Sequence, residues 1–273
     1  MSPCPISNLL DPDAYVNGMP YLELAELRRQ GAVTKMDDPL TGVPYWLVTR
    51  QQELDFVSKH PELFSSAAAT PFPMEQPMED IEAARSMIIG MDPPQHQRHR
   101  RVVREAFTPK AVESYRPRLE RYAREIVDRV AVRGECEFVR DVAAELPLIT
   151  ILEILGVPIS DREQFYEWTN TAIFADDPDM SVSREDGQLA VANMVGYAMQ
   201  LAEQRRKAPG NEMVDTLLNG EVDGEAISEL EFGMMFVLLM VGGNESTRTV
   251  IAHGMRLLME HPDQLAYLVD HPQ

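Results

Sequence analysis

The stretch FVLLMVGGNESTRTVIAHGM, residues 236–255, interrupts an apolar helical pattern with small and polar residues. Gly242 and Gly243 stand side by side in its middle, and Glu245 and Ser246 follow them. Two adjacent glycines inside a helix cost about 2 kcal/mol relative to two alanines. A carboxylate and a hydroxyl in a buried segment need hydrogen-bond partners or a chemical task. The interruption therefore marks a candidate functional site or a helix crossing.

Both interpretations remain open on this motif alone. Glycine lacks a Cβ and so allows a ligand to approach the helix closely. The neighbouring Glu245 and Ser246 would then pass protons between bulk water and a buried reacting group. Thr247 points about 100° away from Ser246 around the helix. The alternative is a helix–helix crossing at Gly242 and Gly243, with the polar side chains facing solvent.

The helix that carries this stretch has a well-marked beginning. Ser228 and Glu231 have the S-x-x-E spacing of a capping box. The helix can continue to Glu260, just before a proline, which gives a length of roughly 48 Å. Nearly every position from 234 to 241 is apolar, so we expect this half to be buried on all sides. We predict that it is the long central helix of the fold.

Composition indicates a single folded protein without a nucleic-acid role. The chain has 273 residues, of which 44% are hydrophobic, and its net charge is −19. That charge argues against a dedicated nucleic-acid binder. Two cysteines, Cys4 and Cys136, indicate a reducing compartment rather than a disulfide framework. The N-terminus has no export signal, and no apolar run approaches the roughly 20 residues of a membrane span. We expect a cytoplasmic location.

The rest of the chain predicts a mainly α (α+β) fold with a small N-terminal β-hairpin. Residues 32–50 alternate apolar and polar side chains around a turn, which is typical of a hairpin. Residues 65–90 have no steady period and predict a long loop, with a helical turn near 78–87. Beyond Pro94 nearly everything is helical. No linker divides the chain, so we predict one domain over residues 1–273.

A second motif, DPPQHQRHRRVVREAFTP at residues 92–109, is basic in an acidic chain. His96 and Arg100 lie four residues apart, on one face of a helix. Three more arginines add positive charge: Arg98, Arg101 and Arg104. This cluster indicates an anionic partner, or else a solvated basic face. A zinc site from His96 and His99 fits the spacing, but the arginines would repel the cation.

Together the two motifs resemble the cytochrome P450 superfamily. GGNES, residues 242–246, matches the pattern of that family's long central helix. The segment 92–109 matches the one whose His-x-x-x-Arg contacts the haem propionates. The order of the intervening elements is also similar, including residues 138–158 and 261–272. The resemblance covers essentially the whole chain.

The resemblance implies a role for each motif residue. Gly242 and Gly243 would flank the groove where dioxygen sits above the iron of heme b. Glu245 would be the acid, and Ser246 the alcohol, of the pair that delivers protons. His96 and Arg100 would bind the propionates. The exposed arginines of the same helix would help to dock an acidic ferredoxin, which a ferredoxin reductase supplies with electrons.

The chain departs from the family at the iron ligand. Neither Cys4 nor Cys136 has the sequence context of the family's thiolate cysteine. The family's later Glu-x-x-Arg pair is also missing. Three pairs have that spacing in the wrong places: Glu26/Arg29, Glu82/Arg85 and Glu245/Arg248. We therefore expect this sequence to be the N-terminal two thirds of such a protein, ending before the ligand.

Residues 231–248 resemble most the bacterial members that hydroxylate sterols and methyl-branched lipids. The implied function is that of a haem-thiolate monooxygenase acting on an apolar substrate with O2. Phe236 and Met240 are candidate pocket residues, although at single positions we favour ordinary helix core. The competing hypothesis is a non-catalytic helical protein that binds an apolar ligand, because the cysteine ligand is absent from the sequence.

Overall fold

The computed structural model describes residues 9–10, 12–16, 18–38, 42–69, 78–104, 107–175, 177, 182–210, 212–222 and 224–271. The chain divides into two compact units, residues 1–97 and 98–273. The single domain predicted from the sequence stays a prediction, because it concerns the relation between the two units.

The first unit combines short helices with the predicted β-hairpin. Strands β1 (Val33–Asp37) and β2 (Pro44–Val48) pair antiparallel, with Val33 opposite Val48. The hairpin is confirmed, while its turn residues 39–41 lie outside the described residues. The helical elements of this unit are the 3-10 turn η1 (Pro12–Tyr15), α1 (Tyr21–Gln30), α2 (Gln51–Lys59), α3 (Met78–Arg85) and the 3-10 turn η2 (Ile88–Gly90).

The predicted loop between residues 65 and 90 is more regular than expected. Its second half forms α3, two full turns where the sequence indicated only one, and η2. Its first residues are held by the carboxylate of Asp92, which accepts hydrogen bonds from Ser65 Oγ (2.5 Å) and the Ser66 amide (2.8 Å). Residues 70–77 lie outside the described part of the chain. These contacts hold the first residues of the segment next to Asp92.

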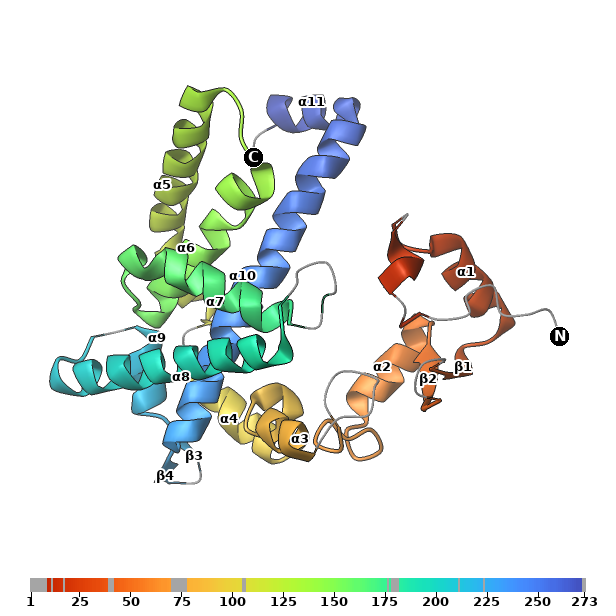
Figure 1. Ribbon diagram of the computed structural model, residues 1–273, viewed down its shortest axis with the longest axis horizontal. Helices are drawn as coiled ribbons and strands as arrows, with labels where there is room; N and C mark the ends of the chain where they lie inside the picture. Colours follow the sequence, from red (N-terminus) through yellow and green to blue (C-terminus); the bar gives the residue numbers. More distant parts are fainter. Residues whose placement is uncertain are drawn as a thin grey trace. The chain divides into compact units, whose positions relative to one another are not determined.

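The second unit is almost entirely helical (Figure 1). Its elements, together with α4, which begins just before the unit boundary, are α4 (Gln95–Arg104), α5 (Pro109–Arg133), the π-helical turn η4 (Val139–Ala143), α6 (Glu145–Leu155), the 3-10 turn η5 (Ile159–Asp161), α7 (Arg162–Ile173), α8 (Arg184–Lys207), α9 (Met213–Leu218), β3 (Glu221–Val222), β4 (Glu225–Ala226), α10 (Glu229–Glu260) and α11 (Pro262–Asp270).

Helix α10 is the central helix of this unit, as predicted. Its N-cap Ser228 accepts a hydrogen bond from the Glu231 amide, and the Glu231 side chain accepts one from the Ser228 amide. The N-terminal half packs against α6 and α8, and its side chains Phe236 and Met240 are fully buried. The rings of Phe236 and Phe165 from α7 lie 6.1 Å apart. None of the described helices is both long and apolar enough to cross a membrane.

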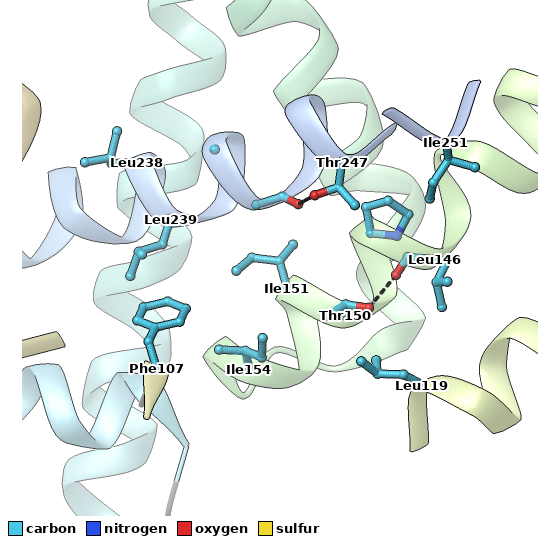
Figure 2. Close-up of a pocket in the computed structure, with 13 residues that line it drawn as sticks. Phe107, Leu119, Leu146, Thr150, Ile151, Ile154, Leu238, Leu239, Thr247 and Ile251 are labelled. Atoms are coloured by element: carbon cyan, nitrogen blue, oxygen red, sulfur yellow. Dashed lines mark hydrogen bonds between the residues drawn. The ribbon is translucent and has the colours of Figure 1, made fainter. Parts of the chain in front are cut away.

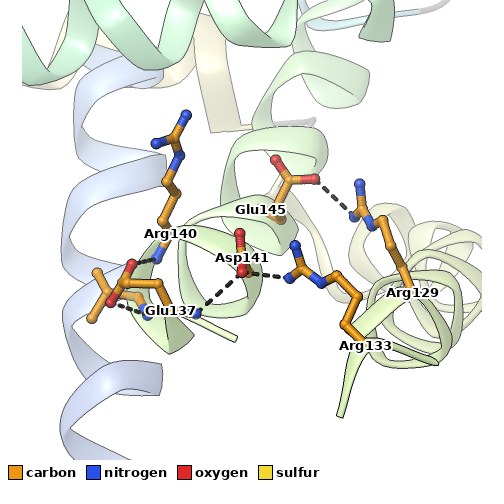
Figure 3. A network of polar contacts seen from close by, with 7 residues as sticks. Arg129, Arg133, Glu137, Arg140, Asp141 and Glu145 are labelled. Carbon is orange, nitrogen blue, oxygen red and sulfur yellow. Dashed lines mark hydrogen bonds and ion pairs between the residues drawn. The ribbon is translucent and has the colours of Figure 1, made fainter. Parts of the chain in front are cut away.

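Ion pairs fasten α5 to the segment that leads into α6 (Figure 3). Arg129 on α5 donates to Glu145 (2.9 Å), and Arg133 donates to Asp141 (2.5 Å). The hydrogen bond from Arg133 lowers the pKa of Asp141, the largest of several effects on this carboxyl. The network fixes the first turn of α6, the helix that crosses α10 at the two glycines.

Candidate functional site

The two adjacent glycines of α10 have different surroundings. A Cβ on Gly243 would lie 2.9 Å from Cδ1 of Ile151 on α6, closer than side chains tolerate. Gly243 is therefore required by the close crossing of α6 and α10. A Cβ on Gly242 would meet nothing within 4 Å, and Gly242 is exposed. Helix packing explains why position 243 is a glycine. It does not explain Gly242 among the described residues, although a glycine there weakens the helix.

An apolar groove of about 560 Å³ opens beside these glycines (Figure 2). It lies between α5, α6 and α10, and its walls are nearly all hydrocarbon. Thr247 lines it, with its Oγ1 donating to the carbonyl of Gly243 (3.2 Å). The lining residues are Phe107, Leu119, Leu146, Pro147, Thr150, Ile151, Ile154, Leu238, Leu239, Gly242, Gly243, Thr247 and Ile251.

Ser246 lies outside this groove. Its side chain is exposed, and Oγ donates to the carbonyl of Gly242 (2.9 Å) one turn earlier. The sequence interpretation placed an acid and a hydroxyl beside whatever the glycines admit, whereas the groove receives Thr247 instead. The reason is that α6 packs against α10 at Gly243, Gly242 lies at the edge of the groove, and Ser246, one turn later, stays uncovered by described residues. The proton-delivery role of Ser246 stays a prediction.

Glu245 points to the other side of α10, where Arg248 holds it. Arg248 is 7% exposed and donates to Oε2 of Glu245 and to Oδ1 of Asn170 on α7 (2.7 Å). Its guanidinium carbon lies 5.8 Å from the centre of the Phe174 ring. The sequence contained the i,i+3 spacing of Glu245 and Arg248 but gave no sign of Asn170. The acid and the hydroxyl thus have separate partners in this structure.

Asn244 completes the buried face of the polar turn. It is fully buried, and its Nδ2 donates to Oγ1 of Thr169 on α7 (3.2 Å). The same hydroxyl donates to the carbonyl of Phe165 (2.8 Å). Sequence reasoning missed Asn244, Thr169 and Asn170 because their pairing depends on how α7 packs against α10. Through these residues, side-chain hydrogen bonds connect the polar turn of α10 to α7.

Phe236 and Met240 do not line the groove. Both are on the face of α10 that α7 and α8 cover, and both have no exposed surface. The structure therefore places these candidate pocket residues in the hydrophobic core, as the alternative interpretation allowed. A contact of either side chain with a substrate remains a prediction.

The basic motif forms α4, as predicted. His96 is half-buried and Arg100 is exposed, and the Arg100 side chain has no hydrogen bond or ion pair with the described residues. His99 is buried, and its Nε2 lies 2.8 Å from Oε1 of Glu231. His99 is one of the two histidines of the zinc alternative, and here its Nε2 is engaged by Glu231. No group of three metal-binding side chains exists among the residues that the structure describes.

Proteins similar to this chain in sequence and fold include cytochromes P450. The chain is 39% identical over 262 residues to the steroid C26-monooxygenase of Rhodococcus jostii, covering 93% of this chain and 55% of that protein. It is 32% identical to a methyl-branched lipid omega-hydroxylase of Mycobacterium tuberculosis, covering 88% of this chain and 58% of that protein. No sequence model of a protein family matches.

Solved cytochrome P450 structures also resemble this chain in fold. A Mycobacterium marinum cytochrome P450 in complex with pseudoionone superposes with a TM-score of 0.79 at 30% identity, covering 92% of this chain and 63% of that one. A Bacillus megaterium relative in complex with testosterone gives 0.76 at 26% identity, covering 93% and 64%. The chain is a homologue of part of a cytochrome P450. It spans less than two thirds of the length of these P450 relatives.

P450 enzymes carry haem, and the residues of this chain fit that group only in part. The exposed Arg100 suits a carboxylate, and the open space at Gly242 suits a small ligand beside the helix. The thiolate ligand does not fit, because Cys136 is a free, exposed cysteine in the segment before η4. Cys4 lies outside the described residues. Among the described residues, Arg100 and Gly242 are thus compatible with a haem, and Cys136 is not placed to hold its iron.

Proposed function

We propose that the protein with this sequence acts as a haem-dependent monooxygenase on an apolar substrate, a sterol or a methyl-branched lipid. Such an enzyme uses O2 and two electrons, places one oxygen atom in the substrate and releases the other as water. One observation supports this proposal above all. Gly242 and Ser246 are exposed one turn apart on α10, directly after its buried N-terminal half.

Four residues of the polar turn of α10, Gly242, Gly243, Glu245 and Ser246, have complementary roles in the proposal. Haem, when bound, supplies the activation of dioxygen. Gly242 leaves room for a diatomic ligand, because it has no side chain and nothing lies within 4 Å of its Cβ position, while Gly243 lets α6 cross beside it. Ser246 holds the proton to be delivered on its Oγ, and Glu245 takes protons from solvent, to which its side chain is 27% exposed. Hydroxyl and carboxylate groups both take part in proton transfer.

Helix α4 serves the cofactor and the electron donor in this proposal. His96 and Arg100 bind the haem propionates, since a guanidinium pairs strongly with carboxylates. Arg101 and Arg104 are exposed on the same helix. Their charge suits the acidic surface of a ferredoxin, which a ferredoxin reductase reduces. A ferredoxin partner is consistent with a cytoplasmic location, because ferredoxin and its reductase take their electrons from cellular reductants.

A second candidate function is a non-catalytic protein that binds an apolar ligand. The observation in its favour is the apolar groove between α5, α6 and α10. In this case an apolar molecule would occupy the groove, and Gly243 would serve only the helix crossing.

The test is the coupling of electron use to product in haem-loaded protein supplied with ferredoxin, its reductase and a sterol with a branched side chain. We expect Ser246→Ala to lower the product formed per electron pair by at least about tenfold, because the proton donor is lost. Thr249→Val, a change at an exposed position of the same helix, is the control. Unchanged coupling in Ser246→Ala would reject the relay. Sterol binding by protein that takes up no haem would favour the carrier.

A further inference from the structure

Helix α4 is attached to the second unit by few side chains. Of its ten residues only His99 and Val103 are buried, and four of the others are arginines. Val102 adds a close contact, since a Cβ on Gly220 would lie 2.3 Å from its Cγ1. So little apolar surface cannot by itself fix how the helix is turned, because hydrophobic contact is not directional.

His99 supplies a directional contact. Its side chain is 3% exposed, and Nε2 lies 2.8 Å from Oε1 of Glu231. The other oxygen of this carboxylate accepts hydrogen bonds from Ser228 Oγ (2.7 Å) and from the Ser228 amide (2.8 Å). One carboxylate therefore caps α10 and holds α4 at the same time.

The charge state of Glu231 favours both contacts. Burial raises the pKa of Glu231, but hydrogen bonds from Ser228 and His99 lower it, and the pKa lies below its ordinary value. The carboxylate is thus ionised at neutral pH and accepts on both oxygens. Hydrogen bonds to an ionised acceptor are the strong ones, and their geometry is narrow.

We propose that His99 is a positioning residue whose bond to Glu231 fixes the rotation of α4 against the first turn of α10, and so aims Arg100 at the haem. This inference rests on the proposed function only for the identity of the anion that Arg100 binds. Consecutive residues of a helix are 100° apart, so locking position 99 also sets the direction of position 100. A leucine at position 99 would fill the buried space without setting that direction.

The first experiment measures haem affinity of the purified chain by absorbance titration. We expect His99→Leu to weaken binding roughly tenfold. His99→Gln should restore most of the affinity, because the glutamine amide reaches the position of Nε2. Glu231→Gln keeps the cap, and His99→Leu added to it should have little further effect. His271→Leu, the same change at an exposed position of the chain, is the control.

The second experiment does not depend on haem. Amide hydrogen exchange should be faster at Val102 and Val103 in His99→Leu than in the wild type, and His99→Gln should restore the protection. Equal protection in His99→Leu and wild type would overturn the inference. So would unchanged haem affinity in fully folded His99→Leu. If the wild type binds no haem, the proposed cofactor role fails, and the exchange data alone decide whether His99 positions α4.

Discussion

At the residue scale, a buried arginine decides how the polar turn of α10 is arranged. Arg248 pairs with Glu245 on its own helix and with Asn170 on α7. Both oxygen partners would lose their strongest donor if Arg248 were removed, and a carboxylate left partly buried without a counter-ion is costly. Glu245 is therefore held on the α7 side of α10, whereas Ser246 is exposed.

We expect Arg248→Ala to lower the free energy of unfolding by about 3 kcal/mol, measured by urea denaturation. Arg256→Ala is the matched control, because Arg256 pairs with Glu260 at an exposed position of the same helix. That change should cost less than about 0.5 kcal/mol. Equal effects of the two substitutions would show that Arg248 contributes no more than a surface ion pair.

At the scale of the element, α10 tolerates its two glycines for separate reasons. Gly243 lets α6 approach, since Ile151 occupies the space of a Cβ. Gly242 faces open space, so the helix gives up stability there without any gain in packing among the described residues. A helix position that is weak for no packing reason is a reasonable place to look for a ligand.

The two glycines should respond oppositely to alanine. Gly242→Ala should stabilise the fold by about 1 kcal/mol, the difference in helix propensity. Gly243→Ala should be destabilising by about 1 kcal/mol, because overpacking against Ile151 exceeds that gain. Urea denaturation of both variants measures the difference. Stabilisation by both substitutions would mean that the α6 crossing needs no glycine.

The elements that the sequence predicted well are those with local signals. Ser228 and Glu231 mark the start of α10 because a capping box involves only neighbouring residues. The hairpin follows from alternation within β1 and β2. The direction of Ser246, Glu245 and Thr247 could not be predicted, because it depends on which side of α10 is covered by α6 and which by α7. His99 was missed for the same reason, since its partner lies 132 residues away.

At the scale of the whole molecule, charge is unevenly distributed. The chain carries a net charge of −19, yet α4 contains four arginines and no acid. Long-range repulsion keeps such an acidic protein apart from nucleic acid and from its own copies. A local basic helix in this setting is suited to anionic groups of a cofactor or a partner. In the second unit, α4 is joined through His99 to the helix that carries Gly242 and Ser246.

The central claim is that the uncovered face of α10 at Gly242 and Ser246 lies against haem. The most direct measurement is the amide NMR spectrum of the chain with one equivalent of ferric haem, with diamagnetic zinc protoporphyrin as the reference. We predict that the paramagnetic iron broadens the Gly242 and Ser246 signals strongly and leaves Ala198, in the middle of α8, sharp. Sharp Gly242 and Ser246 signals at saturating haem would contradict the account.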